Sequence, residues 1–373
     1  MRSFSADLFV LLFVSALSAA LSVAQINSAT PDPPARTPLS GSTIALHASS
    51  TMNVASEMGG AFMSSPKCDA EGNLYIRKLA MDRPLLGPVV KIDPDGKRIA
   101  LFDPTAFSQL GLDRADAFSP ASDGGMYQIA QSGVLKPRIY VLHFSSDGSA
   151  SSPTRLDADF EVYTFAAFAT GNLLVSGVQR DVQNRNDRGR NFTAVFSADG
   201  RELAQLTFQE PLQHARRSAK AGATSDAGGR HIPAKKEAPK GAEKVSPMLD
   251  LADAEVGSDG NLYVMRGTSP ALVYVIAPSG KILQTLKVAA PAGSVPGAFH
   301  ISGNRLAVLF WNGESQSPTV VVADAQTGRR IASYADATGM GTSFACYSAN
   351  DGVFTFLKLG EGNALQVIRA EAQ

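Results

Sequence analysis

The sequence lacks the short patterns that mark several common catalytic and cofactor sites. Its histidines form no HxxxH or HExxH pattern, so a zincin-type hydrolase is not supported. There is no Gly-x-Ser-x-Gly nucleophile elbow and no phosphate-cradling Gly-Lys-Ser/Thr loop. Only two cysteines are present, and neither belongs to a Cys-x-x-Cys-His haem attachment motif.

An excess of either charge is also missing. Lys and Arg together number 34, and so do Asp and Glu, which gives a formal net charge of zero. No global field therefore attracts nucleic acid or an anionic membrane, and a charge-driven partner must recognise a local patch. What the chain does have is 373 residues with 44% hydrophobic positions, enough to bury a substantial core in one large domain or two ordinary ones.

The N-terminus is typical of an exported protein. Arg2 precedes an apolar stretch at residues 8–24 that ends in Ser22-Val23-Ala24, which predicts a signal peptide at residues 1–24, cleaved before Gln25. An uncleaved anchor helix is the alternative, although 17 residues are at the short limit for a membrane span. We expect a periplasmic or extracellular protein with no membrane span after cleavage. Residues 25–41 are rich in Pro and Ser and predict a flexible spacer.

A short pattern recurs along the chain: a turn with a glycine, followed by an alternating apolar run, as in AEGNLYI and SDGNLYVM. The spacings between successive turn glycines are 52, 47, 89, 43 and 49 residues. The spacing of 89 includes a polar insertion at residues 212–247, and without those 36 residues it becomes 53. The turn glycines of these units of roughly fifty residues are Gly72, Gly124, Gly171, Gly260, Gly303 and Gly352.

A second turn follows in each of the first five units, as in DPDGK and SADGR. Asp-Gly between two alternating runs is a strong hairpin signal, because such a turn requires positive φ. Two hairpins in series give four antiparallel strands, A to D, per unit, and this repetition predicts an all-β, six-bladed β-propeller over residues 42–372. The last unit has only three strands, and the segment Ser42–Ala48 is expected to supply the fourth. The second turn glycines are Gly96, Gly148, Gly200, Gly280 and Gly328.

The stretch DAEGNLYI followed by VVKIDPDGKRI resembles the repeats of NHL, TolB-like and SMP-30-like six-bladed propellers. The resemblance covers residues 42–372 and implies the fold more than the function. NHL blades usually follow the second strand with an Asp and an Asn-containing loop, where this chain has Arg77-Lys78 and Met265-Arg266-Gly267. The resemblance therefore does not assign a subfamily.

Loop residues on one face of the predicted propeller are the candidate binding residues. The B–C loops and the blade-to-blade crossings share that face, which would place Arg180, Arg190 and Trp311 there. The Trp311 ring is suited to stacking on a sugar or peptide, or to capping the core between blades. His300 is included as a candidate, although its position on an inner strand favours a channel or core histidine over a ligand-binding residue.

The insertion at residues 212–247, between blades 3 and 4, is the most basic part of the chain. It has eight Lys and Arg residues against three Asp and Glu, a net charge of 8 − 3 = +5. With almost no large apolar side chains, it is predicted to be disordered. One interpretation is a basic arm for an anionic partner, and the other is a tolerated, solvated surface insertion.

The resemblance to SMP-30-like lactonases implies an alternative function. In those enzymes acidic and amide side chains hold a divalent metal at the channel mouth, where it polarises a lactone carbonyl and activates water. Asp116, Glu161 and Asp253 lie in or near inner strands, and their oxygens would suit Ca²⁺ or Mg²⁺. Ordinary polar residues around a wet channel explain the same three residues without a metal.

Cys68 and Cys346 lie in the predicted A strands of blades 1 and 6, which become neighbours when the ring closes. An exported protein permits a disulfide between them, whereas buried free thiols are the alternative. The preferred hypothesis is an exported propeller without a cofactor that binds a protein, glycan or small molecule of the cell envelope, and no nucleic acid. The runner-up is a metal-dependent hydrolase or lactonase.

Overall fold

The structure is a computed structural model, and most of the chain from residue 43 onward can be described. The compact unit that contains these residues spans Thr37–Gln373. The predicted signal peptide and spacer, at residues 1–41, lie outside the described part. The described residues are 43–58, 66–133, 137–157, 160–179, 189–209, 244–245, 249, 251, 254–313, 318–336, 340, 343–361 and 364–372.

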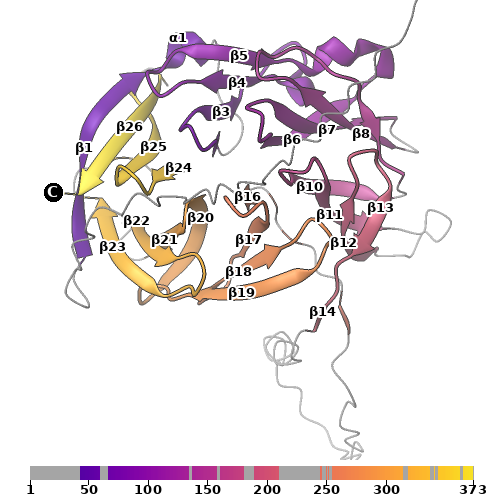
Figure 1. The fold of residues 1–373 in the computed structure, drawn as a ribbon. Coiled ribbons are helices and arrows are strands. Elements are labelled where there is room, and N and C mark those ends of the chain that lie inside the picture. Colours follow the sequence, from indigo (N-terminus) through magenta and orange to yellow (C-terminus); the bar gives the residue numbers. More distant parts are fainter. Residues whose placement is uncertain are drawn as a thin grey trace, which may run out of the picture. The chain divides into compact units, whose positions relative to one another are not determined.

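The unit is all-β apart from three short helical segments, which are α1 (Ala55–Met58), η1 (Pro84–Leu86) and η2 (Pro104–Leu110). Three four-stranded antiparallel sheets follow one another along the first half of the chain (Figure 1). They consist of β2 (Lys67–Cys68), β3 (Leu74–Arg77), β4 (Val89–Ile92) and β5 (Arg98–Phe102); β6 (Arg114–Pro120), β7 (Met126–Ser132), β8 (Arg138–Phe144) and β9 (Thr154–Arg155); and β10 (Glu161–Ala167), β11 (Leu173–Gln179), β12 (Arg190–Phe196) and β13 (Glu202–Gln205).

A fourth sheet of the same kind and one eight-stranded sheet complete the unit. The fourth sheet consists of β16 (Glu255–Val256), β17 (Leu262–Arg266), β18 (Ala271–Ile276) and β19 (Ile282–Val288). The eight-stranded sheet has the order β20-β21-β22-β23-β1-β26-β25-β24. Its strands are β20 (Ser294–Ser302), β21 (Arg305–Asn312), β22 (Pro318–Asp324), β23 (Arg330–Asp336), β24 (Ser343–Ser348), β25 (Val353–Leu359), β26 (Leu365–Ala372) and β1 (Thr43–Asn53).

Strand β1 joins the two ends of the unit. It pairs antiparallel with β26, from Leu46 opposite Ala372 to Asn53 opposite Gln366, and it pairs parallel with β23 over residues 43–46. Figure 1 shows β1 and β26 side by side. The strand is longer than the segment Ser42–Ala48 expected from the sequence. Because β1 bonds to both neighbours, the expected division into six separate units becomes four four-stranded sheets and one eight-stranded sheet, and the count of six blades stays a prediction.

Hydrophobic clusters lie between consecutive sheets and give them a propeller-like arrangement. Val89 and Phe102 of the first sheet pack with Met126 of the second, and corresponding clusters join each later sheet to the next. A further cluster lies within the eight-stranded sheet, between β21–β22 and β24–β26. Another cluster closes the series, because Ile76 of β3 packs with Leu357 of β25. The strand-like alternation read from the sequence therefore buries apolar side chains on both faces of a sheet, one toward each neighbour.

The predicted hairpin turns are confirmed. Each of the eleven turn glycines named from the sequence has a positive φ, between 55° and 90°. At Gly200 (φ 90°) a Cβ atom would also lie 2.1 Å from the Arg155 carbonyl oxygen of the preceding sheet, so the turn needs glycine for space as well as for φ.

The insertion between the third and fourth sheets begins and ends in a short ribbon. Strands β14 (Phe208–Gln209) and β15 (Lys244–Val245) pair antiparallel. Lys244 and Val245 belong to this ribbon, although the prediction counts them within the disordered insertion. Residues 212–243 and 246–247 lie outside the described residues. Among the helices that are described, none is long and apolar enough to cross a membrane.

Candidate functional site

The predicted binding residues do not form one cluster in the described structure. Arg190 is the exposed first residue of β12, whereas Arg180 lies outside the described residues. Trp311, near the end of β21, is half-buried, and a Cβ on Gly297 would lie 2.9 Å from its ring. The ring therefore covers the backbone of neighbouring β20 and packs on the core between sheets, as in the capping interpretation.

His300 is a buried inner-strand residue. Its Nδ1 lies 2.8 Å from Glu255 Oε1, and the other Glu255 oxygen accepts the Ile301 backbone N–H at 2.7 Å. The side chains of His300 and Glu255 are only 8% and 15% exposed. The pair joins β16 to β20, so His300 is held in the interior, in agreement with a channel or core histidine and not with a residue of the loop face.

Lys67 connects the first sheet to the fourth. Its Nζ lies 3.5 Å from the Ala254 carbonyl oxygen, next to Glu255, across 187 positions of sequence. The residue is 8% exposed. A buried ammonium among the inner strands disfavours a divalent cation nearby, because like charges repel strongly where water is excluded.

The metal candidates Asp116 and Glu161 have different surroundings. Among the residues that the structure describes, no group of three or more His, Cys, Asp or Glu could hold a metal ion. Asp253 is outside the described residues. Glu161, at the start of β10, accepts a hydrogen bond from the Tyr163 hydroxyl at 3.3 Å.

Asp116 is enclosed by arginines. Its Oδ1 lies 3.3 Å from Nη1 of Arg77, and its Oδ2 accepts from both Nε and Nη2 of Arg114. Burial lowers the pKa of Arg77 from its usual value, although the Asp116 charge opposes that shift. Both carboxylate oxygens are thus bound to guanidinium groups, which makes Asp116 a poor metal ligand in this conformation.

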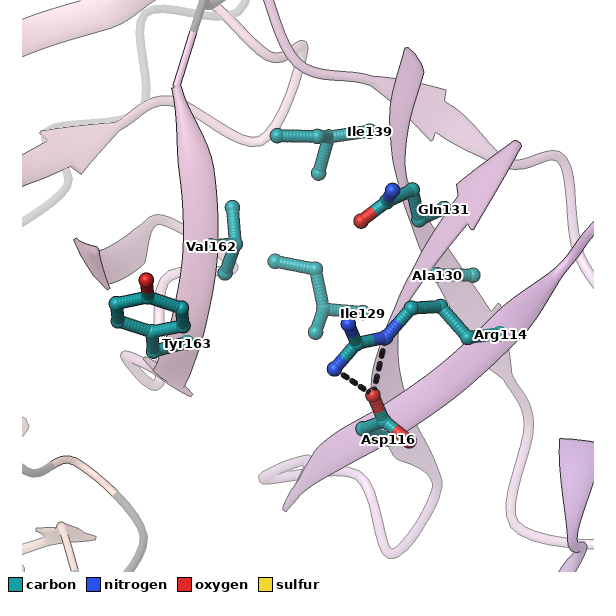
Figure 2. A pocket seen from close by; sticks show the side chains of 8 residues that line it. All are labelled: Arg114, Asp116, Ile129, Ala130, Gln131, Ile139, Val162 and Tyr163. Atoms are coloured by element: carbon teal, nitrogen blue, oxygen red, sulfur yellow. Dashed lines mark hydrogen bonds and ion pairs between the residues drawn. The ribbon is translucent and has the colours of Figure 1, made fainter. Parts of the chain in front are cut away.

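A hollow lies beside this ion pair, between β6, β7 and β8 of the second sheet and β10 of the third. Its lining combines the charged pair with aliphatic walls and two polar side chains (Figure 2). A cavity volume of 20 Å³ holds little more than one water-sized group. The lining residues are Arg114, Asp116, Ile129, Ala130, Gln131, Ile139, Val162 and Tyr163.

Two exposed apolar side chains lie in the segment between β3 and β4 of the first sheet. Met81 is 84% exposed and Leu85, in η1, is 55% exposed. Helix η1 contacts β6, and Arg77 links this segment to the ion pair, because its Nη2 donates to the Leu85 backbone carbonyl oxygen at 3.3 Å while its Nη1 lies 3.3 Å from Asp116 Oδ1. We name this region the Arg114 surface, defined by Met81, Leu85, Arg114, Gln131 and Tyr163.

Sequence reasoning missed most of the Arg114 surface. Only Asp116 was a candidate, and it was assigned to a metal. The Arg114-x-Asp116 spacing was a usable signal, because residues two apart on a strand point to the same side. Nothing in the sequence indicated that Met81 and Leu85 would be exposed, because apolar residues are usually expected to be buried.

The two cysteines form a disulfide. Cys68 of β2 and Cys346 of β24 are bonded with their Cα atoms 5.8 Å apart, within the usual range. The bond joins inner strands of the first sheet and the eight-stranded sheet, which are 278 positions apart in sequence.

The comparisons with known proteins identify no family for this chain. No protein-family model matches the chain, and no curated protein matches it either. Among solved structures, a protein of unknown function from Bacteroides caccae is 12% identical, covers 73% of this chain and 81% of its own, and has a TM-score of 0.43. The Neurospora crassa Pan2 WD40 domain is 9% identical, covers 89% of this chain and 97% of its own, and also has a TM-score of 0.43. The propeller-like arrangement therefore rests on the strand pairing and clusters described above.

Proposed function

We propose that this protein is a β-propeller that binds a protein partner, and that the Arg114 surface is part of its binding face. The observation that carries the proposal is the exposure of Met81 and Leu85 in the segment that Arg77 links to the Asp116 ion pair. Large apolar side chains grouped around an arginine are the composition that protein interfaces favour. The rigid sheets would hold this surface in place while its loops vary.

The topology supports one face as the binding face. Strands β6 and β10 begin, and β3 ends, on the side opposite the glycine turns. The exposed Val295 at the start of β20 and Leu359 at the end of β25 lie on the same side by strand direction, with 59% and 51% exposure. The opposite side consists of short turns in which Asp side chains accept backbone N–H groups, as at Asp93 and Asp147.

We further propose six blades and export. Six blades result if the eight-stranded sheet counts as two, β20–β23 and β24–β26 with β1 as the closing strand; the clusters between consecutive sheets support this count. The Cys68–Cys346 disulfide supports an oxidising compartment such as the periplasm or the extracellular space. A cell-envelope partner follows from that location. The likeness to NHL, TolB-like or SMP-30-like propellers rests on the repeat alone.

The metal-dependent hydrolase gains no support from the described residues. Asp116 is bound to two guanidinium groups, and Lys67 places an ammonium near Glu255. A partner-binding surface requires none of these groups to change its contacts.

Affinity capture with matched baits tests the proposed function. The immobilised wild-type protein, the variant Met81→Asp/Leu85→Asp and the control Leu283→Asp are each incubated with an extract of the source cells, and captured proteins are quantified by mass spectrometry. Leu283 is 50% exposed on β19, away from the Arg114 surface. We expect proteins that the wild type and the control capture equally and the double variant captures about tenfold less. Equal capture by all three folded baits would overturn the proposal.

A further inference from the structure

The Arg114 guanidinium is oriented so that it can accept a second anion. Its Nε and Nη2 both donate to the same oxygen, Asp116 Oδ2. Its Nη1 has no partner among the described residues, and the side chain is 43% exposed. A guanidinium has five N–H donors in a planar fork, so donors remain for a ligand carboxylate.

The charge around the hollow favours an anionic group. Within the ion-pair cluster, Arg77 and Arg114 supply two positive charges against the one negative charge of Asp116, a surplus of +1. The Glu161 carboxylate is outside this cluster and is bound to the Tyr163 hydroxyl. Arg77 is 7% exposed on its side chain, so its charge is poorly screened by water. A ligand carboxylate at Arg114 would balance the surplus.

The wall opposite the guanidinium is aliphatic. Figure 2 shows Val162 of β10 facing Ile129 of β7 across the hollow, with Ile139 and Gln131 at its other end. Ile129 and Ile139 are 7% and 2% exposed, so they form a fixed floor. An apolar group placed there loses water contact without disturbing the charged pair.

The size of the hollow restricts its ligand. A volume of 20 Å³ admits a methyl-sized group but not an aromatic ring. A carboxylate and a methyl group on the same carbon atom place an anion beside a methyl-sized apolar group, which is the chemistry of a polypeptide C-terminus that ends in alanine. An Asp or Glu side chain has no such branch.

We propose that the hollow beside Arg114 binds the C-terminal carboxylate of a protein partner whose last residue has a small aliphatic side chain. This inference rests on the proposed function, and it specifies how the partner is anchored. Arg114 bonds the carboxylate, the aliphatic wall receives the last side chain, and the preceding residues of the partner lie toward Met81 and Leu85.

Fluorescence polarisation with matched peptides tests the inference. The probes are fluorescein-labelled Gly-Ser-Gly-Val-Ala with a free C-terminus and the same peptide with a C-terminal amide. We expect the free acid to bind at least about tenfold more tightly than the amide, because a charge-assisted bond to arginine is lost in the amide. Equal binding of the two peptides overturns the inference.

Two variants and one control locate the site. Arg114→Ala removes the guanidinium, and Gln131→Glu adds an anion at the edge of the hollow without changing its size; each should weaken binding of the free acid about tenfold. Arg329→Ala is the matched control, because Arg329 is exposed in the β22–β23 turn on the opposite face. Unchanged binding by either hollow variant overturns the inference.

Competition distinguishes a partner's terminus from a free acid. Propionate, which has the carboxylate and methyl group of a terminal alanine, should displace the probe only at concentrations far above those of unlabelled peptide, because it lacks the residues that lie toward Met81 and Leu85. Displacement at equal concentration overturns the assignment to a protein terminus. If the free acid does not bind while capture still depends on Met81 and Leu85, the inference fails and the proposed function stands.

Discussion

The two most similar stretches of the sequence, Cys68–Lys78 and Val256–Arg266, form the same turn but connect it differently to the molecule. In the first stretch Asp69 accepts the Asn73 backbone N–H at 2.9 Å and the Tyr75 hydroxyl at 3.1 Å. In the second, Asp259 accepts the Asn261 backbone N–H at 3.1 Å and the Tyr263 hydroxyl at 3.2 Å. The carboxylate has moved two positions along the turn, yet it stabilises the same two groups.

The position of the carboxylate decides its tertiary contacts. The Asp69 side chain is buried and pairs with Lys91 at 3.2 Å, and Lys91 donates to the Gly124 carbonyl oxygen of the second sheet at 2.9 Å. The Tyr75 hydroxyl oxygen lies 2.9 Å from the same carbonyl oxygen. Asp259 is exposed, and Gly257 occupies the position that corresponds to Asp69. The first turn therefore holds two sheets together, whereas the second mainly holds itself.

Among the substitutions around the two turns, removal of the disulfide should lower the free energy of unfolding most. The bond is next to the first turn, because Cys68 adjoins Asp69. In Cys68→Ser/Cys346→Ser the free energy of unfolding should fall by about 4 kcal/mol, since the bond closes a long loop. Urea unfolding measures the change, and the wild type under reducing conditions is the control. An unchanged free energy of unfolding in both samples would show that the bond does not hold the first turn.

The substitution Asp69→Asn should cause the next largest loss of stability. The substitution leaves the Lys91 ammonium, 6% exposed on its side chain, without its carboxylate. We expect a loss of about 3 kcal/mol in the free energy of unfolding.

Asp259→Asn is the matched substitution, and its loss should stay near 1 kcal/mol because the group is exposed. In Asp69→Asn/Lys91→Met part of the stability should return, since the unpaired charge is removed. Equal losses from the two Asp substitutions would contradict the proposed difference between the turns.

Gly257→Ala tests why the carboxylate moved. A Cβ at this position would lie 2.5 Å from Tyr263 Cε2 and 2.7 Å from Asp259 Oδ1. The free energy of unfolding should fall by about 2 kcal/mol through overpacking. Gly267→Ala is the control, because a Cβ there meets nothing within 4 Å. A tolerated Gly257→Ala would mean that the tyrosine ring can move aside.

The smallest effect should be a loss of stability at high pH, when Tyr263 ionises. Burial, followed by the Asp259 charge, raises the pKa of Tyr263 to about 12 from its ordinary value of 10.0. The folded protein holds this proton more tightly than the unfolded chain, so its contribution to stability is complete below pH 10 and is lost as the pH rises toward 12.

The pKa of Tyr75 is raised further, also by burial and then by Asp69. Absorbance titration of the tyrosinates in the wild type, Tyr75→Phe and Tyr263→Phe measures both groups. Each variant should lose one late-titrating tyrosine, and the Tyr75 step should come at the higher pH. Titration of both hydroxyls near pH 10 would contradict the burial argument.

The sequence predicted the local parts of this fold better than the site. Turns at Gly72 and Gly260 and the strands around them follow from φ preferences and alternation, which depend on near neighbours only. The sequence did not reveal that Asp116 pairs with Arg77, because that contact depends on how the first sheet, with β3, packs against the second sheet, with β6. Arg180 and Asp253, outside the described residues, stay predictions.

The amino-acid sequence by itself determined the all-β class, the hairpin turns and the two cysteines available for a bond. The tertiary structure decided which polar groups meet: Lys67 with the Ala254 carbonyl oxygen, His300 with Glu255, and Arg77 with Asp116 beside an aliphatic hollow. The physical reason is how far apart in the chain the interacting residues are. A turn is set by the conformation of a few consecutive residues, whereas an ion pair or a hollow between sheets depends on packing among segments far apart in the chain.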